Sequence, residues 1–333
     1  MRVIVVDQLT KVYRVPVRAP GLMAGVRALW HREFRDVRAV DGVSFTIQPG
    51  ERVGFLGPNG AGKTTTLKIL TGLLKPTSGS AWLLGEPIEN VSSRSRLGFL
   101  PEQPYFYDYL NGVEYLEFVA RLSGMQAQPA LKAARHWLGR VGLGEREKLV
   151  LRKYSKGMLQ RLGLAAALVH DPELIILDEP MSGLDPFGRR DVRDLILEQR
   201  ERGVTVMFSS HILPDVEMLC DRVAILLKGR LERVATVGEL VHGGEPAVEV
   251  RVEGAPVLAF PPAWGGGVTR SDRVGESVFH VTGEALLQDV LAQLVQARAT
   301  IVSVTPIRSS LEELFMAAAE SSAIRATTDR RSA

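Results

Sequence analysis

Hydrophobic and polar positions divide the first 240 residues of the chain into short apolar runs and a longer helical block. Short runs rich in β-branched and aromatic residues predict β-strands. We expect these strands at residues 3–6, 43–47, 52–56, 80–84, 97–100, 174–178, 204–208, 222–227 and 230–234. The last two are predicted to form a hairpin around Lys228 and Gly229.

Helical periodicity prevails over residues 105–170, where apolar positions recur about every 3.6 residues. Beyond this block, Pro186 is suited to open a helix that reaches about Arg202. The helices expected within the block cover residues 113–119, residues 130–141 and, after an N-cap at Ser155, the residues through Leu168.

Residues 14–38 form an insertion with a character of its own. Apolar Leu22, Val26, Leu29 and Trp30 lie at helical spacing, with basic Arg27, His31, Arg32 and Arg35 elsewhere on the wheel. One interpretation is a basic amphipathic helix that touches a membrane surface or a membrane partner. The other is a helix that packs on its own domain and keeps a solvated basic face. The sequence leaves both open.

A change of composition at residues 243–246 predicts a domain boundary. The second domain begins with valines that alternate with charged residues, as in a strand with one solvent-exposed face. It contains no recognisable catalytic cluster. Its expected elements are strands at 248–252, 277–281 and 301–304, a loop at 254–267, a helix at 283–296, a final helix opened by a capping box at Ser309, and a disordered tail from residue 321.

Composition and charge narrow the classes of function. The 333 residues are enough for two domains, and the formal net charge of +3 is small for that length. Because no long basic run is present, electrostatics give no argument for a nucleic-acid partner. The single cysteine, Cys220, excludes an internal disulfide and a zinc cluster, and it fits a core position in a reducing compartment. Without a membrane-spanning run or a secretory signal, the chain is expected to be cytosolic.

A glycine-rich loop stands between the predicted strand at 52–56 and a predicted helix at 66–72. Its sequence is Gly57-Pro58-Asn59-Gly60-Ala61-Gly62-Lys63-Thr64-Thr65, which matches the Walker A pattern G-x-x-x-x-G-K-[ST]. Glycines let backbone N–H groups surround an anion, and the helix N-terminus adds partial positive charge. Lys63 is expected to reach the β- and γ-phosphates of a nucleotide, and the Thr64 hydroxyl to take a Mg²⁺ position. The alternative, a chance glycine-rich turn, does not account for all four fixed positions.

Two acids follow the apolar run at 174–177, as in a Walker B motif. Asp178 would end a buried strand beside the phosphate loop, where a carboxylate can hold Mg²⁺ directly or through water. Glu179 comes one residue later and can face an attacking water. A pair of capping or solvated acids is the alternative interpretation.

Three further residues are weak candidates when each is taken alone. Tyr13 could stack on an adenine base, but a half-buried tyrosine at a strand end would look the same. Gln103 follows a predicted strand and could reach a metal or a water, although most glutamines in loops are only solvated. His211 lies at the end of the strand at 204–208 and could sense a γ-phosphate, although a lone histidine is more often structural.

The segment between the two motifs resembles the signature of ATP-binding cassette (ABC) proteins, which is written L-S-G-G-Q. The segment is Tyr154-Ser155-Lys156-Gly157-Met158-Leu159-Gln160-Arg161. Ser155 and Gly157 match the signature, whereas Tyr154, Lys156 and Met158 differ. The positions of four other features are similar to the Q-loop, the D-loop, the H-loop and the aromatic A-loop of that family: Gln103, the turn at 182–185, His211 and Tyr13.

The resemblance covers residues 1–240 and implies an α/β fold. The expected domain is a P-loop NTPase cassette with a mixed sheet core, an antiparallel β subdomain and an inserted helical subdomain. Residues 245–320 would be a small α+β accessory domain, and residues 321–333 its disordered tail. Residues 101–109, the signature variant and the segment 311–315 are similar to the ATPase subunits of type-2 bacterial exporters.

The resemblance also implies a mechanism with ATP and Mg²⁺ as cofactors. Two ATPase chains, identical or different, would pair head to tail, so that Walker A of one chain and Ser155 and Gly157 of the other bind the same ATP. Glu179, His211 and Gln103 would be catalytic, and Thr64, Gln103 and Asp178 would bind the metal.

The partner implied by the resemblance is a separate membrane permease, to which the chain would bind peripherally at the cytoplasmic face. A soluble cassette ATPase of DNA repair or translation is the alternative, as is a scaffold that binds ATP without useful hydrolysis. The absence of an N-K-x-D motif argues against a GTPase.

Overall fold

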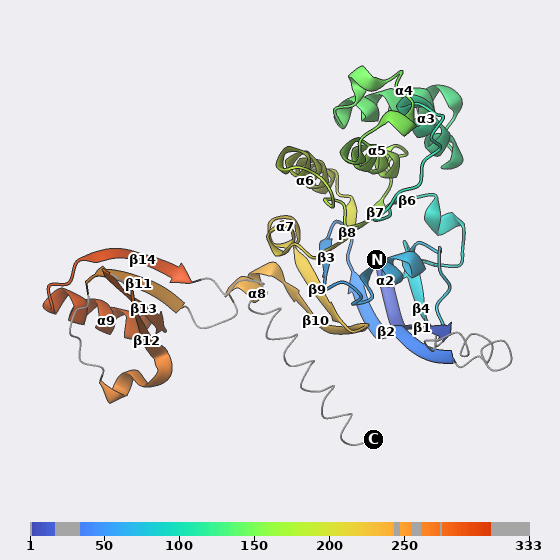
Figure 1. The fold of residues 1–333 in the computed structure, drawn as a ribbon. Coiled ribbons are helices and arrows are strands. Elements are labelled where there is room, and N and C mark those ends of the chain that lie inside the picture. Colours follow the sequence, from blue (N-terminus) through green and yellow to red (C-terminus); the bar gives the residue numbers. More distant parts are fainter. Residues whose placement is uncertain (1, 17–33, 243–246, 255–260, 274, 308–333) are drawn as a thin grey trace, which may run out of the picture. The chain divides into compact units, whose positions relative to one another are not determined.

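The structure is a computed structural model that describes residues 2–16, 34–242, 247–254, 261–273 and 275–307. The chain divides into two compact units, one that ends at Ala235 and one that begins at Thr236 (Figure 1). The boundary expected from composition, at residues 243–246, lies outside the described residues.

A six-stranded sheet forms the centre of the first unit. Neighbouring strands from β9 to β6 run parallel. Every residue of the three central strands is buried, which explains their continuous apolar sequences. The order across the sheet is β10 (Arg230–Thr236), β9 (Arg222–Leu227), β3 (Arg52–Leu56), β8 (Thr205–Ser210), β7 (Leu174–Asp178) and β6 (Leu97–Leu100).

A second, antiparallel sheet has two strands that are much longer than the sequence predicts. Its order is β2 (Phe34–Ile47), β1 (Ile4–Pro16), β4 (Ser78–Leu83) and β5 (Glu86–Pro87). The flanks of the predicted insertion belong to β1 and β2, where Arg14 pairs with Asp36 and Pro16 with Phe34. These flanks are exposed and carry no apolar alternation, so the pattern did not mark them as strands. The amphipathic helix predicted between them falls on residues 17–33, outside the described part of the chain.

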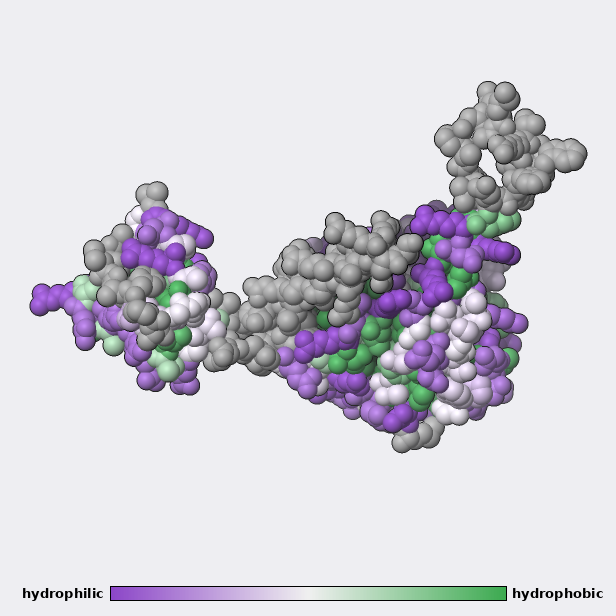
Figure 2. Space-filling model, turned by 90° about the horizontal axis from the view of Figure 1, so that it is seen from below, coloured by the Kyte–Doolittle hydropathy of each residue, from purple (hydrophilic) through white to green (hydrophobic). Residues whose placement is uncertain are grey.

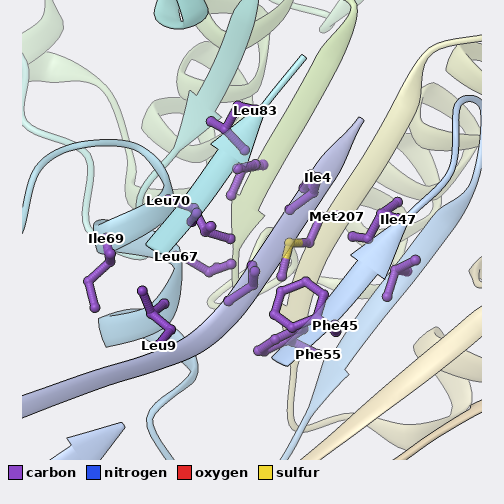
Figure 3. Close-up of a cluster of buried hydrophobic side chains, with 14 of the residues drawn as sticks. Ile4, Leu9, Phe45, Ile47, Phe55, Leu67, Ile69, Leu70, Leu83 and Met207 are labelled. Atoms are coloured by element: carbon purple, nitrogen blue, oxygen red, sulfur yellow. The ribbon is translucent and has the colours of Figure 1, made fainter. Parts of the chain in front are cut away.

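The main core lies where the two sheets and α2 (Lys63–Leu70) meet (Figure 3). The rings of Phe45 and Phe55 pack with their centroids 5.2 Å apart, and both side chains are buried. Full burial of a large apolar side chain contributes about 1.5–3 kcal/mol. Cys220 is buried beside β3, since a Cβ atom on Gly54 would lie only 2.7 Å from its Sγ. The core position predicted for this cysteine is confirmed.

Helices α3, α4 and α5 lie between β6 and β7 in sequence and form a separate lobe in Figure 1. Ser155 caps α5 by accepting a hydrogen bond from the Met158 N–H, and Asp185 caps α6 by accepting one from the Gly188 N–H. Helix α7 was not predicted, because seven residues are too few to show a period. The bounds are α3 (Gly112–Leu122), α4 (Ala127–Arg140), α5 (Lys156–Leu168), α6 (Pro186–Glu201) and α7 (Leu213–Leu219), with 3₁₀ turns at Ser92–Arg94, Gly144–Arg146 and Leu151–Lys153.

The second unit contains an antiparallel sheet and a helix, α9 (Glu284–Gln296), that packs on it around Phe279 and Leu294. Strand β12 was missed because its sequence, VTRSDR, lacks apolar alternation. The predicted final helix and tail lie outside the described residues. The sheet order is β12 (Val268–Arg273), β13 (Glu276–Thr282), β11 (Ala247–Glu253) and β14 (Ile301–Ile307). The described part of the unit also contains α8 (Val237–His242) and a 3₁₀ segment (Pro262–Gly267).

Among the described residues, no helix is long and apolar enough to cross a membrane. In the view of Figure 2, hydrophilic and hydrophobic residues are intermixed over the coloured surface.

Candidate active site

The glycine-rich loop connects β3 to α2, as the sequence predicts. Gly62 has φ +102°, and a Cβ atom there would lie 2.3 Å from the carbonyl oxygen of Ala39. Gly60 also has a positive φ, of +81°. Glycine therefore allows the backbone conformation at both positions and, at Gly62, the close approach of β2. The loop and the N-terminus of α2 can together surround an anion.

Parallel strands bring the other motif residues to the same edge of the sheet. Strand β7 ends at Asp178 and pairs with β8, whose Ser209 lies opposite Asp178 and is followed by Ser210 and His211. A pocket of about 320 Å³ opens at this edge. Its lining residues are Ala39, Pro58, Asn59, Gly60, Ala61, Gly62, Lys63, Thr64, Thr65, Glu102, Glu179 and His211.

Lys63, Glu179 and His211 form a charged cluster in this pocket. The Lys63 Nζ lies 3.5 Å from the Glu179 Oε1 and donates a hydrogen bond of 2.6 Å to the carbonyl oxygen of Gly57. The other carboxylate oxygen of Glu179 lies 2.8 Å from the His211 Nδ1. Lys63 and Glu179 are almost fully buried, whereas the His211 side chain is 52% exposed. One carboxylate is thus held between a cation and an imidazole at the mouth of the phosphate loop.

Asp178 and Thr64 have the chemistry of a magnesium site. The Thr64 hydroxyl donates to the Asp178 Oδ1 at 3.2 Å. The other oxygen of this carboxylate, Oδ2, is buried and has no hydrogen-bond partner. Mg²⁺ prefers carboxylate, hydroxyl and water oxygens. A buried carboxylate oxygen without a partner beside the phosphate loop fits a bound cation.

Ser209 is a residue of this site that the sequence analysis did not single out. Its hydroxyl donates to the Asp178 Oδ1 at 2.6 Å and accepts a hydrogen bond from the Glu179 N–H at 2.9 Å. Its position two residues before His211 at a strand end was the only available signal, and that signal does not distinguish Ser209 from Ser210.

The structure does not bring Gln103 to the pocket and places its neighbour Glu102 there instead. Gln103 is exposed. Successive side chains along a non-helical segment point in different directions. Adjacent residues such as Glu102 and Gln103 therefore do not both face the pocket. The residue of this loop that faces the phosphate pocket is an acid.

Three other predicted binding residues lie away from this pocket in the single chain. Ser155 and Gly157 are at the start of α5, and neither lines the pocket. Tyr13 is 37% exposed on β1 and pairs with Val37, which stands two residues before the lining residue Ala39 on β2. The Tyr13 ring also lies 5.4 Å from the Lys11 Nζ.

A second hollow, of about 290 Å³, lies at the opposite ends of β7 and β8. It is lined by Asp171, Arg202 and Thr205, among others, and contains none of the motif residues. Arg202 and Asp171 form an ion pair with each other. We assign this hollow no role.

Comparison with known proteins identifies the family. Residues 40–182 match the family model described as ABC transporter. The ABC transporter ATP-binding protein sll0415 of Synechocystis is 41% identical over 282 residues, 84% of this chain and 78% of the relative. The protein all4389 of Nostoc is 38% identical over 94% of this chain and 89% of its own. The linearmycin resistance ATP-binding protein LnrL of Bacillus subtilis is 37% identical over 65% of this chain and 70% of its own.

Solved structures show the same fold. The dimeric cassette MJ0796 bound to ADP and Pi has a TM-score of 0.60 and 25% identity, and the match covers 70% of this chain and 98% of that one. An ATP-binding subunit of an ABC transporter has a TM-score of 0.61 and 28% identity over 72% of this chain and 92% of that one. The predicted P-loop cassette is therefore confirmed. Because relatives are matched over most of their own length, the chain belongs to the family of ABC transporter ATP-binding proteins, and it is an ATPase.

Proposed function

We propose that this chain hydrolyses ATP to power export by a separate membrane permease, to which it binds peripherally at the cytoplasmic face. The observation that carries the chemical part is the cluster of Lys63, Glu179 and His211 at the phosphate loop. The direction of transport is supported by relatives named for linearmycin resistance and bacitracin transport, since resistance is most simply explained by removal of the compound.

Glu179 is the general base in this proposal. Its carboxylate orients a water molecule for in-line attack on the γ-phosphate and accepts its proton. His211 holds this carboxylate from the open side of the pocket, and Lys63 neutralises charge on the phosphate oxygens. Phosphoryl transfer depends mostly on positioning and charge neutralisation, which these three side chains supply.

Mg²⁺ would be held by Thr64 and Asp178. When bound, it neutralises charge that develops on the phosphate oxygens. We assign the contribution of the neighbouring loop to Glu102 in place of Gln103, because Glu102 lines the pocket. A carboxylate is also a stronger ligand for a hard cation than an amide.

The separation of Ser155 and Gly157 from the pocket supports a two-chain arrangement. In this arrangement, the start of α5 from a second ATPase chain, identical or different, approaches the nucleotide held by the first. The N-cap and the free N–H groups of α5 then form a second anion site on the γ-phosphate. Tyr13 stacks on the adenine. ATP favours the closed pair, and hydrolysis reopens it.

The permease contact is assigned to an aromatic surface that follows the Glu102 loop. Tyr105 is 97% exposed and Tyr109 is 73% exposed. The ring of Tyr107 packs against Tyr109 and Phe118, with centroids 6.0 and 5.6 Å apart. Exposed aromatic side chains grouped in this way are typical of a protein interface. The second unit is proposed as an accessory domain for regulation or dimer contacts.

Glu179→Gln tests the chemical part of this proposal. The amide keeps the size of the side chain but cannot accept a proton, so turnover should fall by about 10²-fold or more while ATP binding is retained. Turnover and nucleotide binding should be measured on the same preparations. Glu145→Gln, an exposed change on a 3₁₀ turn, is the matched control. Normal hydrolysis by Glu179→Gln would show that the base is another residue.

Co-purification tests the transport part. A multi-span membrane protein should be retained by the intact chain and lost when Tyr105 and Tyr109 are both changed to Ser. Retention of a DNA-repair or ribosomal complex instead would favour the non-transport alternative.

A further inference from the structure

Ser209 lies at the point where the two acids of the active site meet the central sheet. It is fully buried, at 0% exposure. Its hydroxyl donates to the Asp178 Oδ1 at 2.6 Å and accepts from the Glu179 N–H at 2.9 Å. One oxygen atom therefore connects the side chain of one acid to the backbone of the next.

The backbone of Glu179 is in an unusual conformation. Its φ is +50°, in the left-handed region that residues other than glycine seldom occupy. Such a conformation persists only where surrounding contacts hold it. The hydrogen bond from the Glu179 N–H to Ser209 is the contact made by this backbone group.

The conformation changes where the Glu179 side chain points. Successive side chains of a strand point to opposite faces of the sheet. Ile175 and Leu177 on β7 face Leu164 of α5 and Leu195 of α6. Continued alternation would send Glu179 to the same side. Instead its carboxylate reaches Lys63 and His211 in the phosphate pocket, so the left-handed residue redirects it.

The hydroxyl of Ser209 has one proton, and the geometry fixes where it goes. The Glu179 N–H already donates to the Ser209 oxygen, so the hydroxyl proton is directed to the Asp178 Oδ1. The Ser209 contacts thus join the acid of the proposed metal site to the backbone of the proposed base. The strand register supports this arrangement, since Asp178 and Ser209 form the last residue pair between β7 and β8.

We infer that Ser209 is a positioning residue, which holds Glu179 in its left-handed conformation and aims its carboxylate at the phosphate pocket. The catalytic consequence rests on the proposed role of Glu179. The conformational part stands apart from that role, because it concerns only the backbone of this chain.

Amide hydrogen exchange tests the conformational part on the nucleotide-free chain. Ser209→Ala removes the acceptor of the Glu179 N–H, so exchange at that amide should be at least about tenfold faster. Ser93→Ala is the matched control, because Ser93 is also fully buried and its hydroxyl donates one hydrogen bond, to the carbonyl oxygen of Asn90 at 2.9 Å. The control should lose stability but keep the exchange rate at Glu179.

Steady-state kinetics test the catalytic consequence. In Ser209→Ala, kcat should fall about 10–100-fold while KM for ATP stays within about threefold, because the base is misplaced but the phosphate loop is intact. Ser209→Thr and Ser209→Val form a pair of nearly equal shape that differ in the hydroxyl. Thr should recover most of kcat, and Val should not.

The outcomes separate this inference from the proposed function. Unchanged exchange at Glu179 in Ser209→Ala would overturn the inference, as would a loss of turnover that Val and Thr share equally. Should neither branched variant fold, the comparison of Ser209→Ala with Ser93→Ala decides. If Glu179→Gln hydrolyses ATP normally while Ser209→Ala exchanges faster, the role of Glu179 fails and the conformational assignment stands.

Discussion

The phosphate pocket and the first turn of α5 differ in how many of their charged groups already have a partner within one chain. In the pocket, Lys63 and Glu179 are almost fully buried and bound to each other. At the start of α5, the Ser155 side chain accepts a hydrogen bond from the Met158 N–H of its own helix, and the first turn contains no acidic residue. The charged groups of the pocket are therefore already paired within one chain. The N-terminus of α5, by contrast, has partial positive charge that no acid in its first turn balances, so it can bind an anion from elsewhere. Substitutions in the pocket should therefore lower ATP binding by a single chain, whereas substitutions at the start of α5 should lower turnover at high protein concentration.

Loss of Lys63 should have the largest effect and should appear in a single chain. Lys63→Ala removes the cation of the phosphate loop and leaves the buried carboxylate of Glu179 with His211 but without its lysine partner. ATP affinity should fall by about 10³-fold, as measured by binding of a fluorescent nucleotide at low protein concentration. Lys68→Ala, one turn later on the same helix, provides the control. Equal affinities for the two variants would contradict the view that the pocket is complete in one chain.

Loss of Ser155 should instead appear only in the paired state. Ser155→Ala should leave ATP binding by the dilute chain within about twofold but lower turnover at high protein concentration by about 10–100-fold. The lost N-cap should also cost about 1 kcal/mol of stability. Asp185→Ala removes a comparable cap from α6 and controls for that cost. If turnover does not depend on protein concentration in the unmodified chain, this contrast between the two regions disappears.

The sheet beneath the pocket offers a prediction about pH. Asp221 binds Arg52, the first residue of β3, through its Oδ1 at 2.7 Å, and Arg52 is almost fully buried. Burial raises the pKa of Asp221, but the hydrogen bonds and charge of Arg52 outweigh it and hold that pKa below the ordinary value. A lowered folded-state pKa means that the stabilisation is present above the unfolded-state value and is lost as the pH falls through the folded-state value.

Asp221→Asn should therefore lower the free energy of unfolding by about 2–3 kcal/mol at neutral pH. The difference from the unmodified chain should shrink below about pH 4, where the unfolded chain begins to take up the proton, and should be lost as the pH falls through the lower folded-state pKa of Asp221. Denaturant titrations at several pH values measure both effects. A difference that stays constant down to pH 2 would show that the charge of Asp221 is not its source.

Substitution of Tyr13 should have the smallest effect, and it tests whether the nucleotide site extends from the phosphate pocket to this residue. If its ring stacks on the base, Tyr13→Ala should weaken ATP binding by about tenfold, and Tyr13→Phe should change it little. Binding of inorganic triphosphate should be the same in all three proteins, because it has no base. Equal ATP affinity for the Ala variant would assign Tyr13 to the β1–β2 ribbon alone.

How far the sequence predicted the structure depends on burial. The central strands were found because both of their faces are buried and their sequences are continuously apolar. The outer parts of β1 and β2 and the whole of β12 were missed, since a ribbon with exposed faces carries no such pattern. The short helix α7 was missed for lack of length.

The site shows the same limit at the scale of single residues. The Walker motifs predicted which residues gather at the phosphate loop, because each motif combines a strand end with a fixed local geometry. Ser209 could not be identified in this way, since its function depends on the pairing of β7 with β8. Likewise, no spacing rule determines whether Glu102 or Gln103 turns toward the pocket.

The burial of Cys220 makes the chain convenient for spectroscopy. Burial raises the pKa of its thiol well above the ordinary range, so very little thiolate is available to react with maleimide or nitroxide reagents. A new cysteine placed at an exposed position, such as Phe187 at the start of α6, would then be the only reactive thiol in the protein. Reporter groups attached there would allow the proposed opening and closing of a pair of chains to be followed without first removing the native cysteine.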